Sequence, residues 1–221
     1  MKSWLAFMCA AVLLGAAVEV KADDRPAAAE RQIRAVVVLV VLGEFPKELV
    51  DAVAAELERV YQVEVRRRAA IELPKDAWYA PRKRYRADIL LGHLGALAKG
   101  MPDGTRVLGL TSVDISTSKD KFKDWGVFGL GELGGTAAVV SGFRLWKKSK
   151  DPRKIRWRVV NTAVHELGHV LGLDHCEEPR CVMLDAQGGI DNTDGSTGVP
   201  GPACAAALER ASPLRPASSL E

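Results

Sequence analysis

Residues 165–176 contain three of the chain's four histidines, in the order HELGHVLGLDHC. His165 and His169 are four residues apart, so on an α-helix both imidazoles lie on one face and can reach a single metal ion. Gly172 can take the left-handed conformation that ends a helix, and the chain can then turn and bring His175 back as a third nitrogen ligand. Three protein ligands with one position left open are typical of a catalytic zinc site.

Glu166 follows the first histidine directly, so its carboxylate projects beside the metal. There it can hold a water molecule and take its proton as a general base. Zinc would lower the pKa of that water from about 16 to about 7, which provides a nucleophile at neutral pH. A bare H-E-x-x-H arises by chance on many helices. Gly172 and His175 complete the longer signature H-E-x-x-H-x-x-G-x-x-H, which makes three incidental histidines on a core helix a rare alternative.

We therefore predict a zinc metallopeptidase that hydrolyses peptide bonds, with the metal on His165, His169 and His175 and with Glu166 as the catalytic base. One alternative is a zinc-binding module with little or no hydrolytic activity. Another is a metalloenzyme that acts on something other than a peptide. The retained Glu166 argues against a pure binder, because binding alone does not need that carboxylate.

The segment after the third histidine carries Cys176, Cys181 and Met183. The methionine is similar to the Met-turn of the metzincins, where a thioether forms an apolar floor under the metal, although a core methionine is the plainer alternative. The chain matches every specified position of H-E-x-x-H-x-x-G-x-x-H-C-x4-C-x-M, and it thereby resembles the archaemetzincins. The resemblance extends with lower specificity from about residue 33 to 210, including segments 108–114 and 127–132.

The archaemetzincin pattern continues with seventeen residues and C-x-x-C, whose second cysteine is Cys204 here and whose first is replaced by Gly201. In that family the four cysteines bind a second, structural zinc. Three alternatives stay open here. In the first, Cys176 and Cys181 form a disulfide, and in the second, Cys204 pairs with one of them. The third alternative is a zinc on three sulfurs with a water or a carboxylate such as Glu177 as fourth ligand. Oxidising compartments favour disulfides, so the sequence leans slightly towards a disulfide.

The N-terminal residues have the features of a secretory signal peptide. Lys2 gives a positive start, residues 5–18 are apolar, and Val20-Lys21-Ala22 suits a signal peptidase. We expect residues 1–22 to be removed and the protein to be secreted or periplasmic, with an uncleaved membrane anchor as the weaker alternative. No later run reaches the ~20 apolar residues of a membrane span.

The charge of the chain does not indicate an acidic partner. Removal of residues 1–22 takes away Lys2, Lys21 and Glu19, so the formal net charge falls from +3 to +2. The basic runs at 66–68 and 82–86 are short and have no stacking aromatics arranged around them, which favours solvated surface over a nucleic-acid site. We expect a peptide or protein substrate, no nucleic-acid partner, no membrane contact after signal cleavage, and a monomer.

Apolar patterns around the metal motif predict an α/β fold, because strands alternate with helices. A long helix begins at Asp151-Pro152, carries the zinc ligands in its last turns and ends near Gly172. Strands are expected at 33–42, 62–66, 106–110 and 136–145. Three further helices are expected: one begins at Pro46, and the others cover 86–99 and 203–210.

The resemblance implies a metzincin-like zincin with a mixed, mostly parallel twisted sheet and an antiparallel edge strand. That edge strand would pair with an extended peptide substrate. We expect one catalytic domain at 23–210, divided near Gly172 into subdomains of about 31–172 and 173–210, with a flexible tail at 211–221. The predicted substrate edge strand, for which an interior strand is the alternative, consists of Ala137, Ala138, Val139, Val140 and Ser141.

Overall fold

The computed structural model describes residues 35–147 and 149–211. The predicted signal peptide at 1–22 lies outside these residues, as does the predicted tail from residue 212 onward. Within the described part, no helix combines the length and the apolar character needed to cross a membrane.

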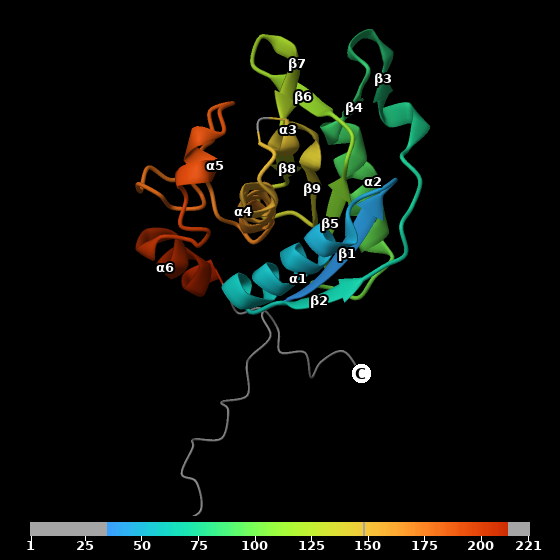
Figure 1. Cartoon of the computed structure of the whole chain (residues 1–221). Helices are drawn as coiled ribbons and strands as arrows, with labels where there is room; N and C mark the ends of the chain where they lie inside the picture. Colours follow the sequence, from blue (N-terminus) through green and yellow to red (C-terminus); the bar gives the residue numbers. More distant parts are fainter. Residues whose placement is uncertain (1–34, 148, 212–221) are drawn as a thin grey trace, which may run out of the picture. The chain divides into compact units, whose positions relative to one another are not determined.

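Five strands form the main sheet in the order β2-β1-β5-β9-β8 (Figure 1). The first four run parallel to their neighbours, and β8 is antiparallel to β9. This arrangement confirms the predicted mixed, mostly parallel sheet with an antiparallel edge strand. The bounds in chain order are β1 (Val36–Leu42), β2 (Glu64–Arg67), β5 (Arg106–Thr111), β8 (Gly129–Gly131) and β9 (Ala137–Ser141).

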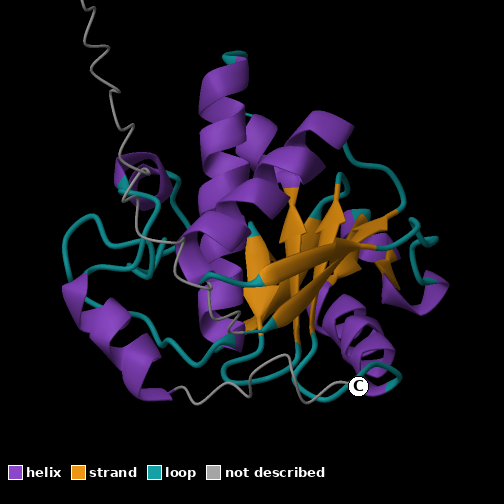
Figure 2. Cartoon of the chain, turned by 90° about the horizontal axis from the view of Figure 1, so that it is seen from below, coloured by secondary structure: helices purple, strands orange, loops and turns teal. Residues whose placement is uncertain are grey.

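Helices cover both faces of this sheet, as Figure 2 shows. One face packs on α1 (Lys47–Tyr61) and α4 (Pro152–Val170), and the other packs on α2 (Ala87–Lys99). Successive strand residues point to opposite faces, so Val37 belongs to the core beneath α1 and α4 whereas Val38 belongs to the core beneath α2. Burial on both faces explains why β1 is a continuous apolar run rather than an alternating one.

A second, smaller sheet has the order β3-β4-β6-β7 and was not predicted from the sequence. It projects beyond one end of the main sheet, and β7 leads directly into β8 (Figure 1). Two of its strands have only two and three residues, and the other two mix polar and apolar residues without regular alternation, so none has the pattern that identifies a strand. Their bounds are β3 (Trp78–Tyr79), β4 (Arg84–Arg86), β6 (Ile115–Lys119) and β7 (Phe122–Val127), with 3-10 turns η1 (Lys75–Ala77) and η2 (Ala80–Arg82) beside β3.

The predicted position of the edge strand is wrong. Residues 137–141 form β9, which lies inside the sheet between β5 and β8, and all five of these residues are buried. Their small and apolar side chains fit a strand that is covered on both faces. The edge strand is β8, which lies in a glycine-rich segment. The strand predicted at 136–145 also ends early, because Ser141 accepts a hydrogen bond from the Phe143 N–H at 3.2 Å and starts α3 (Gly142–Trp146).

The long helix α4 begins and ends as the sequence predicts. The Asp151 carboxylate accepts a hydrogen bond from the Arg153 N–H at 2.9 Å, and Pro152 occupies the first turn. Gly172 has φ +94° just after the helix, a conformation that suits glycine. Two short helices follow, α5 (Asp191–Gly195) and α6 (Pro202–Ala211). The division into subdomains at this point stays a prediction.

Candidate metal centres

Three imidazoles from the end of α4 and the following turn converge on one point. The Nε2 atoms of His165 and His169 are 3.1 Å apart, those of His169 and His175 are 3.2 Å apart, and those of His165 and His175 are 3.3 Å apart. Two nitrogen ligands of a tetrahedral zinc are separated by about 3.3 Å, given Zn–N bonds of roughly 2.0–2.1 Å. The donor set and its spacing therefore fit zinc, and the helical spacing and the glycine turn bring these three residues together as predicted.

Backbone carbonyls orient two of the rings. His165 Nδ1–H donates to the Val182 carbonyl at 2.7 Å, and His169 Nδ1–H donates to the Leu173 carbonyl at 2.8 Å. A carbonyl only accepts, so the ring proton is on Nδ1 and the Nε2 lone pair faces the common centre. Sequence reasoning missed these contacts, because a carbonyl partner carries no residue-type signal.

Burial favours the neutral form of two of these imidazoles, those of His165 and His169. Burial, with a smaller contribution from neighbouring His169, lowers the pKa of His165 to about 4. Burial also lowers the pKa of His169. A neutral imidazole is the form that binds a metal, so these rings need not lose a proton at pH 7 to become ligands.

Glu166 lies beneath the edge strand β8 and is buried. Burial raises the pKa of its carboxyl to about 8, opposed by a hydrogen bond from the Gly131 backbone, and a divalent cation beside it would favour the charged form. A Cβ atom on Gly129 would lie 2.6 Å from Glu166 Oε1. Only glycine lets the strand pass so close to the carboxylate, a constraint that the glycine-rich sequence could have signalled.

Met183 is fully buried against α4. A Cβ atom on Gly168 would lie 2.5 Å from the Met183 sulfur, so the thioether packs on the helix beside His169. Met183 thus makes an apolar contact with α4 next to the predicted zinc ligands, and its role as a Met-turn stays a prediction. The remaining histidine, His93, is bonded to Asp76 at 2.9 Å, and it is not part of this group.

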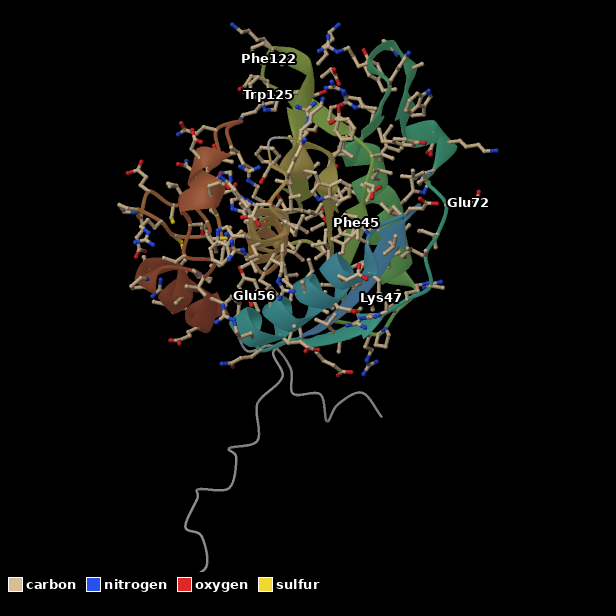
Figure 3. The ribbon with its side chains drawn as sticks, viewed as in Figure 1. Phe45, Lys47, Glu56, Glu72, Phe122 and Trp125 are labelled. Atoms are coloured by element: carbon tan, nitrogen blue, oxygen red, sulfur yellow. The ribbon has the colours of Figure 1, made fainter. Side chains whose placement is uncertain are left out.

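A cleft of about 440 Å³ opens beside the three histidines and Glu166. The edge strand β8 lines it, together with side chains from the β6–β7 hairpin such as Lys119 and Trp125. Figure 3 shows Trp125 and Phe122 on this hairpin, and their ring centroids are 5.2 Å apart. Arg144 also lines the cleft, and Asp114 holds its guanidinium through contacts of 2.7 and 3.1 Å. The lining of the cleft therefore includes an aromatic ring and two cationic side chains besides the imidazoles.

The three cysteines gather in a second group, with their sulfurs all within 4.8 Å of one another. Cys181 Sγ and Cys204 Sγ are 3.8 Å apart, which matches the roughly 3.8 Å between sulfurs on a tetrahedral zinc and exceeds the roughly 2.05 Å of a disulfide. Cys176, Cys181 and Cys204 are all free, so the slight preference for a disulfide is wrong in this structure. The N–H groups of Met183 and Gly201 donate to Cys181 Sγ at 3.3 and 3.1 Å.

Burial favours the protonated thiol form in this second group. It raises the pKa of the Cys204 thiol to about 12, and it also raises the pKa of the Cys176 thiol. A zinc ion would reverse this preference, because thiolate is the form of cysteine that binds metal. The sulfur spacing and the hydrogen bonds to Cys181 fit a metal site.

Catalytic zinc is commonly held by three protein ligands with a carboxylate nearby, and the end of α4 offers this combination beside an open cleft. The fold and the site together define a zinc-dependent metallopeptidase. Sequence comparison leads to the same class: a profile described as Peptidase family M54 matches residues 35–210, and the chain belongs to this family.

Relatives and solved structures agree with this assignment. An archaemetzincin of Haloquadratum walsbyi is 31% identical over 152 residues, which are 66% of this chain and 83% of that protein. The crystal structure of an archaemetzincin from Methanopyrus kandleri aligns with a TM-score of 0.68 at 32% identity, over 80% of this chain and 94% of the other. A zinc-dependent peptidase from Methanocorpusculum labreanum aligns with a TM-score of 0.68 at 25% identity, over 78% and 99%. The resemblance to archaemetzincins is thus confirmed.

Proposed function

We propose that this metallopeptidase cleaves peptide bonds with zinc on His165, His169 and His175 and with Glu166 as general base. The convergence of the three Nε2 atoms at 3.1–3.3 Å carries the proposal. When bound there, zinc supplies the Lewis acidity that activates water and polarises the scissile carbonyl. Met183 supports the imidazoles from below without contacting the metal.

Glu166 moves the protons of the reaction. It takes one proton from the attacking water as the water oxygen bonds to the carbonyl carbon. It then gives this proton to the leaving nitrogen as the carbon–nitrogen bond breaks, so that one water is consumed and a carboxylic acid and an amine are formed. Its burial beside Gly129 and Gly131 keeps the carboxylate away from bulk water and supports this role.

The edge strand β8 aligns the substrate in this proposal. One side of β8 pairs with β9, and no strand of the described residues pairs with its other side. An extended peptide can form backbone hydrogen bonds along such an edge. Because Gly129, Leu130 and Gly131 all line the cleft, a peptide bound there passes close to the imidazoles.

Replacement of Glu166 tests the proposal. We expect Glu166→Gln to keep its zinc, because the three imidazoles are intact, and to lose about 10²–10⁴-fold in cleavage rate, the usual contribution of a general base. The measurement is zinc content and cleavage of a mixed peptide library. Glu48→Gln on the exposed side of α1 is the matched control and should cleave like the wild type. Zinc-loaded wild type that cleaves no peptide would instead support a zinc-binding module.

We also propose that the protein acts outside the cytoplasm after removal of residues 1–22. The charged start, the apolar run and Ala22 before Asp23 support this proposal. Intact mass measurement of the protein from its native cells should show a mature chain that begins at Asp23. A chain that still starts at Met1 and stays in the membrane fraction would favour an anchor.

A further inference from the structure

Gly201 lies next to the three-cysteine group. The Gly201 N–H donates to Cys181 Sγ at 3.1 Å, so this residue adjoins the sulfurs. A Cβ atom on Gly201 would lie 2.3 Å from Glu178 Oε2 and 2.5 Å from Glu178 Oε1. Atoms that close cannot coexist, and the Glu178 carboxylate therefore occupies the space that a side chain at position 201 would enter.

The Glu178 carboxylate has an unsatisfied oxygen in this position. Its Oε2 is buried and has no hydrogen-bond partner among the residues that the structure describes. A buried carboxylate oxygen without a partner costs free energy, so such an atom calls for a ligand. The adjacent Glu177, which the sequence suggested as a ligand, is exposed instead.

The backbone of Glu178 is part of the same turn. Its carbonyl accepts a hydrogen bond from the Cys181 N–H at 3.2 Å. The Glu178 oxygens are not part of the group whose ligand atoms all lie within 4.8 Å of one another, so this flexible side chain has to turn towards the sulfurs to share a metal with them.

We propose that Cys176, Cys181, Cys204 and Glu178 form a second zinc site of three thiolates and one carboxylate, in which Glu178 takes the place of an absent fourth sulfur. Four protein ligands leave no open position, which is typical of a structural zinc. Binding releases the three thiol protons to solvent. None of the four residues lines the cleft, so this site is independent of the peptidase proposal.

The site ties together two parts of the C-terminal segment. Cys176 and Cys181 precede Val182, whose carbonyl orients His165, and Cys204 lies in α6. Zinc on these ligands would fix the loop that supports the catalytic imidazoles to the final helix.

Cobalt reports this site separately, because thiolate-to-cobalt charge-transfer absorption arises from the sulfurs and not from the imidazoles. Metal-free full-length protein is titrated with Co²⁺ under reducing conditions, and Zn²⁺ is then added in competition. We expect Glu178→Gln to weaken zinc binding at this site at least tenfold, because a charged ligand is lost. Glu177→Gln is the matched control and should bind zinc as the wild type does.

Glu178→Gln could lose zinc binding through a folding defect, so a second variant is tested beside it. Gly201→Cys combined with Glu178→Ala supplies a fourth sulfur and removes the carboxylate that blocks it. We expect this double variant to regain tight zinc binding, and X-ray absorption of the zinc-loaded proteins to give more sulfur per zinc than in the wild type. Equal zinc affinity in Glu178→Gln and wild type would overturn the proposal, as would failure of the double variant to regain binding.

Discussion

At the scale of single residues, glycines decide how closely the edge strand approaches the active-site helix. A Cβ atom on Gly131 would lie 2.5 Å from the backbone carbonyl oxygen of Glu166 and 3.1 Å from His169 Cβ. A backbone oxygen cannot rotate away as a flexible side chain can. Alanine at position 131 must therefore push β8 away from α4.

We expect Gly131→Ala to destabilise the protein by about 1–3 kcal/mol, the usual cost of overpacking, and to reduce peptide cleavage. Urea unfolding and a peptidase assay measure the two effects. Gly92→Ala is the control, because a Cβ atom there meets nothing within 4 Å on the exposed side of α2. It should stabilise by about 0.5–1 kcal/mol through helix propensity. Equal stability of the two variants would contradict the steric argument.

At the scale of elements, a buried ion pair holds α5 on α4. Arg158 Nε and Nη2 bind the two Asp194 oxygens at 2.6 and 2.7 Å, and Lys154 contacts the same carboxylate at 3.1 Å. The Arg158 side chain is only 3% exposed. Removing the carboxylate would leave a buried guanidinium without its partner, which is costlier than losing a surface pair.

We predict that Asp194→Asn lowers the free energy of unfolding by about 3 kcal/mol, whereas Lys47→Ala, which removes an exposed pair with Asp51, changes it by less than about 1 kcal/mol. Denaturant unfolding at pH 7 checks both values. A loss of less than about 1 kcal/mol in Asp194→Asn would show that the pair does not hold the two helices.

The same pair predicts a pH dependence. The hydrogen bond from Arg158 is the main cause that lowers the pKa of Asp194. Because the folded pKa lies below the unfolded value of about 3.9, the stabilisation is present above about pH 4 and is lost as the pH falls through the folded pKa. The difference in unfolding free energy between wild type and Asp194→Asn should therefore shrink below pH 4. A constant difference would contradict this assignment.

At the scale of the whole molecule, metal binding and folding are coupled. Cys176 and Cys181 come just before two residues that support the histidine group. The Val182 carbonyl binds His165, and Met183 packs on α4. Cys204 belongs to α6. A ligand that binds only the folded state stabilises it by RT ln(1 + [L]/Kd), about 4 kcal/mol at a thousandfold excess over Kd. The metal sites should therefore contribute to the stability of the whole domain.

We expect two zinc ions per wild-type chain, a lower Tm after treatment with a chelator, and recovery of the Tm when zinc is added. Cys204→Ser should keep the histidine zinc and lose the other. Elemental analysis and thermal unfolding measure these outcomes. An unchanged Tm in the chelator, with zinc removed, would show that the metals do not stabilise the fold.

Sequence patterns predict well where the physics is local. His165 and His169 meet because a helix repeats every 3.6 residues, and Gly172 ends that helix because glycine tolerates positive φ. The main strands follow from apolar runs, which mark burial in the sheet. The strands β3 and β4 escaped prediction, because two and three residues are too few to show such a pattern.

The sequence by itself determined the family, the parallel sheet and the group of three histidines, because each depends on periodicity or on a short motif. Tertiary structure alone decided that β8 rather than β9 is the edge strand, since strand order depends on pairing between distant segments. It also decided that the Glu178 carboxylate, and not that of Glu177, lies against Gly201. Two adjacent glutamates are equivalent in sequence, and only the fold buries an oxygen of one while it leaves the other side chain exposed.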